Sequence, residues 1–353
     1  MIETNSQLII HGNILRNNIN YIKKKLQKRS KFMAVIKSDA YGHKIEKVVH
    51  DINDLVDGYG VVRLDEAKKI RNITDKKILL MQGVYTKNEL FEAKKLNLDT
   101  VIHNQHQFEL VKQNRIFDNL WLKINTGMNR LGFEINEFMD IYNEYLTDKH
   151  FVLMTHLAAS NDINANSNHQ QFKKFDNLSK IMHQNVSKSV ANTGCIMNFP
   201  EKTYDWVRCG IGIYGGYFKN DAIKTAMTLR SPIVNIRKIY EGDRVGYDGR
   251  AEAKKNMLLA TVYLGYADGL PLAIKDGTEV KINNKIAKVF GRVSMDLTTV
   301  DVTNIEDCNI GDWCEFFSSE LPVSNIAKSN DLISYYFMTS IKSRVKKIYK
   351  NIN

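Results

Sequence analysis

A lysine directly after a short apolar run could act as a nucleophile. Lys37 follows Phe32-Met-Ala-Val-Ile36 and precedes Ser-Asp-Ala-Tyr-Gly-His43. Partial desolvation at the end of a buried strand lowers the pKa of an amine and makes it reactive toward an aldehyde. Tyr41 could bring its hydroxyl to the same place. The alternative is an ordinary solvated lysine and a tyrosine that packs in a turn.

A second segment combines cations with two glycines. It reads Lys123-Ile-Asn-Thr-Gly-Met-Asn-Arg-Leu-Gly-Phe133. Gly127 and Gly132 allow tight turns, and Lys123 and Arg130 supply positive charge that could meet an anionic ligand. The alternative is a plain loop with solvated bases.

Two further segments could hold a flat, phosphorylated ligand. His156 ends another apolar run, and its ring could stack on a flat cofactor, although a lone histidine is commonly a packing residue. Thr193 offers a hydroxyl, and Arg208-Cys-Gly-Ile-Gly-Ile-Tyr214 offers backbone N–H groups. Together these donors would suit a phosphate. The glycines do not form the GxGxxG fingerprint of dinucleotide-binding proteins.

The last chemistry-bearing segments lie in the C-terminal third of the chain. They read Gly265-Tyr-Ala-Asp-Gly269 and Gly291-Arg-Val-Ser-Met-Asp296. Both are predicted at turns or strand ends. Taken alone, glycines on both sides of a tyrosine indicate only a turn.

The elements that would position these residues alternate between strand and helix. Helical spacing occurs between the apolar runs, as at Leu15, Ile19, Ile22 and Leu26. Strands that are buried on both faces read as apolar runs, and eight of them with crossover helices fit a closed (β/α)8 barrel of the TIM type, with the site at the carboxyl ends of the strands. A doubly wound open sheet is the alternative. The eight predicted strands span 32–36, 58–63, 77–82, 100–103, 120–124, 151–156, 186–191 and 207–214.

After about residue 227 the pattern changes to alternating strands with turns. Strands are predicted at 233–237, 241–245, 258–263, 280–282, 287–289 and 297–302. We therefore predict a barrel domain of residues 1–226 followed by a β-rich C-terminal domain of residues 227–353. The extreme N-terminal strand could join the C-terminal domain.

Composition narrows the classes of function. The 353 residues carry 50 Lys+Arg against 39 Asp+Glu, a formal net charge of +11, and the 43% hydrophobic residues exclude a disordered chain. The lysines are spread along the chain with acids between them, so no nucleic-acid surface is predicted. No apolar run reaches the ~18 residues of a membrane span. The N-terminus is polar and the four cysteines lack CxxC spacing, so we predict a cytoplasmic protein with no metal site.

In this order and spacing, the five groups of motifs resemble the alanine racemases of the barrel type, which use pyridoxal 5'-phosphate (PLP). The likeness runs from Phe32 to Tyr349. Its most specific parts are Ala-Val-Ile-Lys-Ser-Asp-Ala-Tyr-Gly-His, Asn-Thr-Gly-Met-Asn-Arg-Leu-Gly, Gly-Tyr-Ala-Asp-Gly and Gly-Arg-Val-Ser-Met-Asp. The resemblance implies an isomerase that interconverts L- and D-alanine and supplies D-alanine for peptidoglycan. It also implies a homodimer whose sites are shared between subunits.

The resemblance also implies which residues hold the cofactor. Lys37 would carry PLP covalently through its amine, His156 would pack on the ring, and Arg208 would contact the pyridine nitrogen. An arginine stays protonated, so it would weaken the electron sink of the cofactor and limit side reactions. The phosphate would be bound by Tyr41, Thr193, the backbone of Gly210 and Ile211, and Tyr335.

Two bases on opposite faces of the α-carbon are the simplest way to racemise it. The resemblance implies that these bases are Lys37 and, from the partner subunit, Tyr266. Arg130 would lie near the ring hydroxyl and the substrate carboxylate. The positive charges of Arg130 and Arg208 would favour the tyrosine phenolate. Met295 and Asp296 would lie beside the substrate carboxylate. In some family members the lysine that matches Lys123 is carbamylated and steadies the arginine that matches Arg130.

The sequence departs from the family pattern at three positions and leaves other functions open. Lys44 stands where the family usually has glycine, Cys209 where proline or another apolar residue is common, and Tyr336 where an acid is usual. Substrate breadth, carbamylation of Lys123 and the monomer–dimer equilibrium are not decided by the sequence. A racemase of serine or basic amino acids and a PLP-binding protein without turnover are alternatives. A PLP decarboxylase fits less well, because the Gly-Tyr-Ala-Asp-Gly and Ser-Met-Asp segments follow the racemase pattern.

Overall fold

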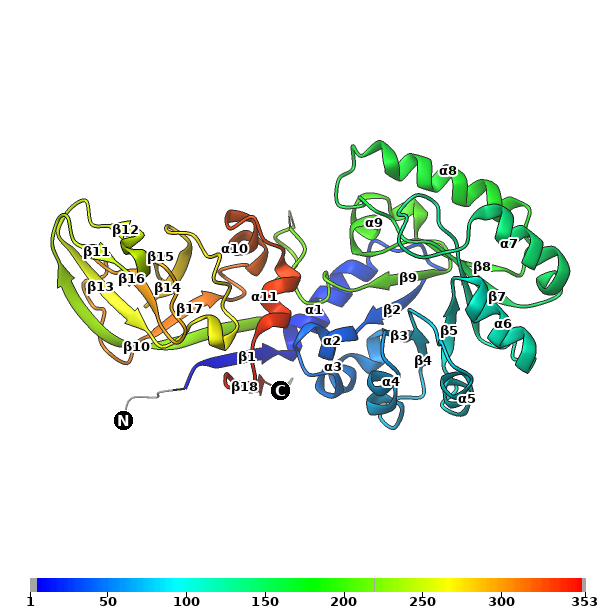
Figure 1. Cartoon of the computed structure of the whole chain (residues 1–353), viewed down its shortest axis with the longest axis horizontal. Helices are drawn as coiled ribbons and strands as arrows, with labels where there is room; N and C mark the ends of the chain where they lie inside the picture. The colour runs from blue at the N-terminus through cyan, green and yellow to red at the C-terminus, as the bar shows by residue number, and fades with distance from the viewer. Residues whose placement is uncertain (1–4, 219, 351–353) are drawn as a thin grey trace. The chain divides into compact units, whose positions relative to one another are not determined.

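The computed structural model describes residues 5–218 and 220–350, and it divides into two compact units (Figure 1). The barrel unit comprises residues 19–40 and 44–212, and the β unit comprises residues 1–18, 41–43 and 213–353. The first four residues of the polar N-terminus lie outside the described residues. The chain passes from the β unit into the barrel unit within helix α1 (Gly12–Lys23).

Eight parallel strands form the barrel, in the order β8-β7-β6-β5-β4-β3-β2-β9. Backbone hydrogen bonds join β8 and β9, with the residues that flank them, and close the barrel: Asp205 N donates to Lys188 O (3.1 Å) and Arg208 N donates to Ala191 O (2.9 Å). The predicted closed barrel is therefore confirmed, and the open sheet is wrong. The strands are β2 (Lys31–Val35), β3 (Gly58–Val61), β4 (Lys77–Leu80), β5 (Asp99–Ile102), β6 (Leu120–Lys123), β7 (Phe151–Met154), β8 (Ser187–Ser189) and β9 (Trp206–Cys209).

Several strands end earlier than predicted because the chain turns toward its next helix. Strand β3 stops at Val61, since the Glu66 carboxylate accepts hydrogen bonds from the N–H groups of Val62 (3.0 Å) and Arg63 (3.1 Å). The predicted strand that ends at Tyr214 stops at Cys209. The barrel interior is filled by a cluster of large side chains, namely Met33, Leu79, Val101, Trp121, Met154 and Trp206.

Helices lie outside these strands in Figure 1. They begin where polar side chains satisfy the first N–H groups, as Thr86 does for Glu89 N and Asn104 does for Gln107 N. Helices α3 and α9 were not predicted, although Ile45, Val48, Val49 and Ile52 have helical spacing. The barrel helices are α3 (Ile45–Ile52), α4 (Leu64–Arg71), α5 (Lys87–Lys95), α6 (Gln105–Asn114), α7 (Ile135–Ile141), α8 (Asn166–Lys180) and α9 (Thr193–Asn198). Shorter elements are the 3-10 helices η1 (Asn53–Leu55) and η3 (Pro200–Lys202) and the π-helix η2 (Tyr142–Leu146).

The segment after β2 is a left-handed turn, α2 (Lys37–Tyr41). Its residues 38–41 have φ between 53° and 56°, and none is glycine. This conformation costs roughly 1–2 kcal/mol for each L-residue, so other contacts must stabilise the turn. In the barrel unit, Ser38 N donates to Glu66 Oε1 (2.6 Å) and Asp39 Oδ1 accepts from Ile45 N (2.9 Å). Lys44 also has a positive φ of 63°, which gives a physical reason why a glycine suits that position.

The β unit is built on an antiparallel sheet, as predicted for the C-terminal part. Its strand order is β13-β16-β15-β14-β17-β10-β1-β18, and β13 also pairs with β10. The N-terminal strand β1 pairs with β10 antiparallel and with β18 parallel. The strands are β1 (Gln7–His11), β10 (Met227–Ile239), β11 (Arg244–Val245), β12 (Ala251–Glu252), β13 (Met257–Val262), β14 (Glu279–Ile282), β15 (Lys285–Val289), β16 (Thr298–Asp301), β17 (Trp313–Phe317) and β18 (Lys346–Lys350).

Helices were not predicted after residue 227, yet α10 (Val323–Ser329) and α11 (Ser334–Ser340) are present, with turns η4 (Tyr247–Gly249) and η5 (Tyr266–Asp268). The domain boundary at residue 226 stays a prediction. Within residues 5–218 and 220–350, no helix is long and apolar enough to cross a membrane, and no group of three His, Cys, Asp or Glu side chains could hold a metal ion.

Candidate active site

Five of the site residues that the sequence nominates lie in the barrel unit, at the carboxyl ends of its strands. Lys37 begins α2 after β2, Lys123 ends β6, and Arg208 lies in β9. His156 follows β7, and Arg130 lies in the loop after β6. Burial lowers the pKa of His156 well below its usual value, and the charges of Arg208, Lys123, Arg130 and Lys37 lower it further. The imidazole is therefore neutral in this cluster of cations.

The Lys37 amine loses its proton more readily than the amine of an ordinary exposed lysine. Burial lowers its pKa, and the nearby Arg130 guanidinium lowers it further, while Glu66 acts in the opposite direction. An amine with a lowered pKa is more readily available as a nucleophile and as a base than an ordinary lysine. The tight turns that position Arg130 need their glycines: φ is 140° at Gly127 and 125° at Gly132. A Cβ at Gly132 would also lie 2.6 Å from Asn125 N.

Lys123 is a buried amine with an unusual proton affinity. Its exposed fraction is 7%. Burial lowers its pKa to about 8, with Arg208, Arg130 and Lys37 as further causes in that order. A substantial share of the Lys123 amine is therefore uncharged near pH 8.

Replacing Lys123 by methionine should stabilise the cofactor-free protein at pH 7. The unfolded lysine keeps its proton up to pH ~10.4, whereas the folded one loses it near 8. Between these values the unfolded state binds more protons, so wild-type stability rises with pH and the advantage of Lys123→Met shrinks. We expect an advantage of about 1–3 kcal/mol at pH 7. Chemical denaturation in CO2-free buffer at pH 7 and 10 measures it.

The matched control for this comparison is Lys174→Met, since Lys174 is an exposed lysine of helix α8 in the same unit. Its difference from wild type should stay small at both pH values. An advantage of Lys123→Met that is equally large at pH 7 and pH 10 would contradict the burial of a titrating amine at this position.

Arg208 is a buried cation that donates hydrogen bonds to three other residues. Its Nη1 donates to Ser189 Oγ, and its Nη2 donates to Thr155 O (2.6 Å) and Val190 O (3.4 Å). Burial lowers its pKa to about 10, which keeps it charged at neutral pH. Its buried Nε–H has no hydrogen-bond partner among residues 5–218 and 220–350. A buried donor of this kind points to a missing acceptor.

A small cradle of donors lies between α9 and the end of β9. Gly210 N and Gly212 N both approach Thr193 Oγ1 at 3.3 Å, and Cys209 lies 3.4 Å from the same hydroxyl. A Cβ at Gly212 would come within 2.7 Å of the Thr193 methyl group, so the close approach needs a glycine there. Ile211, the remaining residue of this segment, is buried.

The β unit gathers Tyr266, Met295 and Asp296. Tyr266 N donates to Ser294 O (3.1 Å) and Ala267 N to Met295 O (2.9 Å), which fixes the tyrosine beside the Met295 segment. Arg344 Nη2 donates to Asp296 Oδ1 (2.8 Å). Tyr266 is 39% exposed and Met295 is 53% exposed. A surface depression of about 470 Å³ is lined by Gly246, Tyr247, Ser294, Met295, Asp296 and Leu297.

Tyr41 and Tyr335 also come together within the β unit. Their ring centroids are 5.7 Å apart, and Tyr41 stacks on the buried Tyr214 at 4.6 Å. Tyr335 lies on α11 and is 40% exposed, and its neighbour Tyr336 is 48% exposed. These contacts hold the Tyr41 ring within an aromatic cluster, whereas Tyr335 keeps part of its surface in solvent.

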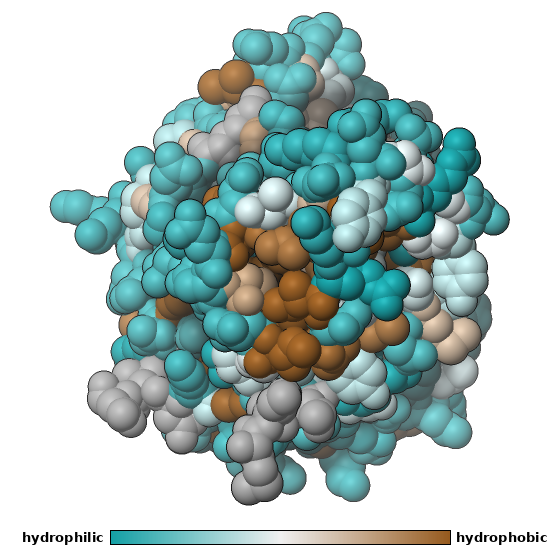
Figure 2. All heavy atoms as spheres, turned by 90° about the vertical axis from the view of Figure 1, so that its left-hand side faces the viewer, coloured by the Kyte–Doolittle hydropathy of each residue, from teal (hydrophilic) through white to brown (hydrophobic). Residues whose placement is uncertain are grey.

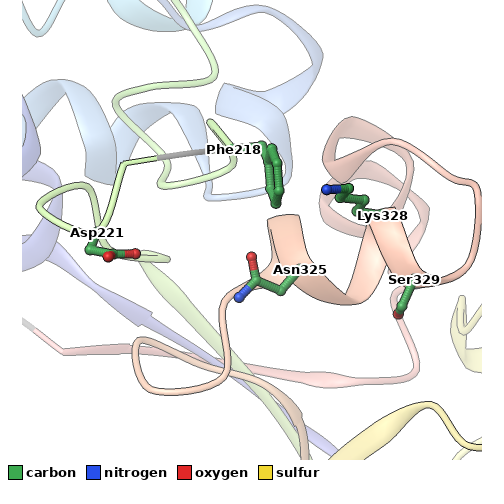
Figure 3. Close-up of a pocket in the computed structure, with 5 residues that line it drawn as sticks. All are labelled: Phe218, Asp221, Asn325, Lys328 and Ser329. Atoms are coloured by element: carbon green, nitrogen blue, oxygen red, sulfur yellow. The ribbon is translucent and has the colours of Figure 1, made fainter.

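A larger hollow of about 580 Å³ contains none of the nominated residues. It is lined by Phe218, Asp221, Asn325, Lys328 and Ser329 (Figure 3). Figure 3 shows the Lys328 amine turned toward the Phe218 ring, and its Nζ lies 4.2 Å from the ring centroid. The lysine charge is already engaged by this cation–π contact, so we place the chemistry elsewhere.

Sequence reasoning missed three residues that support the site. Glu66 holds the left-handed turn through Ser38 N, Ser189 accepts a hydrogen bond from Arg208, and Gln171 bonds to the loops at the barrel mouth. Gln171 left a weak signal, because it is a polar residue that shares a helical stripe with Phe175 and Leu178. Glu66 left a local signal as an acid in the first turn of a helix. Its bond to Ser38 and the bond between Ser189 and Arg208 left none, since each joins residues that are far apart in the sequence.

The fold and the site together define a class: a closed parallel barrel and an antiparallel β unit, with a reactive amine, a buried guanidinium and a donor cradle in the barrel. Residues 10–218 match the sequence model described as alanine racemase, N-terminal domain, and residues 226–349 match that of the alanine racemase C-terminal domain. The chain belongs to the alanine racemase family.

Individual relatives cover nearly the whole chain. The alanine racemase of Vesicomyosocius okutanii is 38% identical over 344 residues, which is 95% of this chain and 96% of that protein. The structure of alanine racemase from Acinetobacter baumannii matches with a TM-score of 0.93 at 29% identity, over 99% of this chain and 100% of the other. An alanine racemase from Bartonella henselae with covalently bound pyridoxal phosphate shares the fold, with a TM-score of 0.89 at 23% identity, over 99% of this chain and 100% of the other.

Proposed function

We propose that this chain is an isomerase that interconverts L-alanine and D-alanine with PLP as its cofactor. Family membership over both units supports this activity. The observation that carries it is Lys37, an amine at the end of the first barrel strand whose pKa is lowered by burial and by Arg130. The product D-alanine would serve peptidoglycan synthesis. A cytoplasmic location stays a prediction.

The residues of the barrel unit fit PLP. The buried Nε–H of Arg208, which lacks a partner among the described residues, would meet the pyridine nitrogen. The Thr193 hydroxyl and the backbone of Gly210 and Ile211 would bind the phosphate, and a Cβ at Gly212 would crowd that cradle. Lys37 would hold the cofactor covalently and His156 would pack on its ring. From the resemblance, Tyr41 and Tyr335 would add phosphate contacts.

Racemisation then depends on two proton carriers. When bound, PLP draws electrons from the α-carbon of the amino acid and makes its proton acidic. Lys37 Nζ would remove or return the proton on one face, and Tyr266 Oη would do so on the other. Arg130, Met295 and Asp296 would orient the substrate carboxylate. Arg208 stays charged at neutral pH, so it would donate a hydrogen bond to the ring nitrogen without giving up its proton, and it would limit the electron-withdrawing power that the cofactor supplies.

Lys123 is proposed to carry a carbamate. Its pKa of about 8 leaves part of the amine uncharged, and an uncharged amine adds CO2 with loss of one proton. The carbamate would place a negative charge among Arg208, Arg130 and Lys37, which are the cations that lower the Lys123 pKa. It would steady Arg130, as in those family members whose matching lysine is carbamylated.

The activity is tested by racemisation assays on a panel of L-amino acids that includes alanine, serine, lysine and arginine. We expect alanine to be racemised with the highest kcat/KM. Comparable rates with serine or basic amino acids would favour the broader racemase. A yellow protein that racemises none of them would be a PLP-binding protein without turnover.

We also propose that the protein is a homodimer in which Tyr266 serves the site of the other subunit. Figure 2 shows apolar side chains gathered on one face of the molecule. The β unit exposes large apolar side chains, and Leu258, Leu272, Met295 and Leu297 are at least 37% exposed. A patch of exposed apolar surface is typical of an interface. A second copy of the chain that covered this surface would bring the two sites together.

Subunit exchange gives a direct test of the shared site. Lys37→Ala and Tyr266→Phe should each be inactive, but a mixture that exchanges subunits should regain activity. In a heterodimer one site carries both lesions and the other carries neither. At full random exchange about half of the dimers are mixed, so roughly a quarter of wild-type activity should return. No recovery despite exchange shown by mass spectrometry would place Tyr266 in its own subunit's site or outside the reaction.

A further inference from the structure

Gln171 is a buried polar residue on a helix stripe that also carries the buried Asn168 and large apolar side chains. It lies in α8 and is 1% exposed, next to Phe172 and on the same stripe as Phe175 and Leu178, which are all buried. A buried amide costs free energy unless its donors and acceptor are paired. The position of Gln171 therefore calls for a specific set of partners.

The Gln171 amide joins two loops at the barrel mouth. Its Nε2 donates to Thr126 Oγ1 (3.0 Å) and to His156 O (3.0 Å), and its Oε1 accepts from Ala158 N (2.9 Å). Thr126 belongs to the loop after β6 that carries Arg130, and the other two partners follow β7. One side chain thus ties together the segments that carry Arg130 and His156.

The direction of the hydrogen bonds requires a donor at this position. Thr155 Oγ1 donates to Ile124 O (2.9 Å), because a carbonyl can only accept. The Thr155 hydroxyl must then accept from the Thr126 hydroxyl (2.8 Å), and Thr126 must accept from Gln171. A carboxylate in place of the amide would face two acceptors. The hydroxyl protons of Thr126 and Thr155 therefore have one arrangement in which each makes a hydrogen bond: Thr126 donates to Thr155, and Thr155 donates to Ile124 O.

The chain ends on the backbone that holds Arg208. Thr155 O accepts from Arg208 Nη2 (2.6 Å), and the next carbonyl, that of His156, accepts from Gln171. Gly127 packs against the same glutamine, since a Cβ there would lie 3.4 Å from Gln171 Cγ. The successive carbonyls of Thr155 and His156 are therefore each fixed by a hydrogen bond, one from Arg208 and one from Gln171.

We propose that Gln171 is a positioning residue of the racemase site, which locks the β6 and β7 loops in one arrangement. It contacts neither substrate nor reacting atoms, and it acts through Thr126 and the His156 backbone. The inference rests on the proposed function for its catalytic consequence. We call the three hydrogen bonds of the Gln171 side chain, to Thr126, His156 and Ala158, the clamp. The clamp forms within the chain, without cofactor or substrate.

Two pairs of variants test the clamp. Gln171→Glu removes the donor at constant shape, and Gln170→Glu is its matched control on the exposed side of the same helix. Thr126→Val removes the hydroxyl at constant shape, and Thr126→Ser restores it. We expect kcat/KM per cofactor-loaded site, counted by borohydride labelling, to fall by about 10- to 100-fold in Gln171→Glu and Thr126→Val. The two control variants should keep most of their activity.

Hydrogen exchange on the cofactor-free protein provides a readout besides activity. Amides of residues 125–133 and 156–158 should exchange faster in Gln171→Glu and Thr126→Val than in the two controls, while amides of the barrel strands stay protected. The double variant Gln171→Glu/Thr126→Val should lose no more activity than the more severe single variant, because both remove the same linkage.

The outcomes separate the two proposals. Unchanged loop exchange and unchanged activity per site in both Gln171→Glu and Thr126→Val would overturn the clamp. If Gln171→Glu does not fold, Thr126→Val against Thr126→Ser decides the question. A wild-type protein without racemase activity would overturn the proposed function, and the exchange comparison would still decide whether Gln171 holds the loops.

Discussion

Replacing Lys37 by alanine should abolish racemisation and the absorbance of the covalently bound cofactor. The variant loses both the amine that holds PLP and the base for one face of the α-carbon. We expect activity to fall by at least ~10⁴-fold, since a positioned base alone contributes 10²–10⁴-fold. Racemisation assays, visible spectra and mass spectrometry after borohydride reduction measure the three consequences.

The matched control is Lys47→Ala, because Lys47 is an exposed lysine of α3 in the same unit. This variant should keep its yellow colour, its borohydride label at Lys37 and its activity. Full activity in Lys37→Ala, with a label on another lysine, would move the site to a different part of the barrel.

Replacing Tyr266 by phenylalanine should separate the two faces of the reaction. Racemisation should fall by about 10²–10⁴-fold in both directions, because reversibility forbids the loss of one direction alone. Lys37 can still remove the α-proton of the enantiomer that faces it, by family resemblance D-alanine, and return a solvent proton to the same face. In D2O we therefore expect deuterium to enter D-alanine with retention of configuration and L-alanine far more slowly.

Chiral chromatography with mass spectrometry distinguishes the labelled enantiomers. Tyr240→Phe serves as the control, since Tyr240 is an exposed tyrosine of the same unit that lies outside the nominated residues. Equal deuterium in both enantiomers of Tyr266→Phe would show that one mobile base or a water molecule moves the proton, and the two-base mechanism would be wrong.

The eight barrel strands could be predicted because each is a local apolar run. Parallel strands that are buried on both faces are apolar throughout, so β2 and β6 stand out from the polar segments on either side. The ends of the strands could not be predicted as well. Strand β3 stops where the Glu66 carboxylate caps Val62 N and Arg63 N, and apolar pattern carries no information about that contact.

In the β unit, too, some elements could be predicted from the sequence and others could not. Its C-terminal strands alternate visibly, yet the sheet is completed by β1, whose partner β10 lies more than 200 residues away. Helices α10 and α11 escaped prediction because each has only seven residues and a short apolar stripe is ambiguous between helix and strand.

By itself, the sequence determined the closed barrel, the β-rich C-terminal part and the family, because these depend on apolar runs and motifs of adjacent residues. Only the tertiary structure decided the left-handed turn after Lys37, the lowered pKa of Lys123 and the hydrogen bonds that hold Arg208. It alone revealed the clamp by Gln171. These properties arise from burial and from partners on other strands and helices, which come together only when the barrel closes.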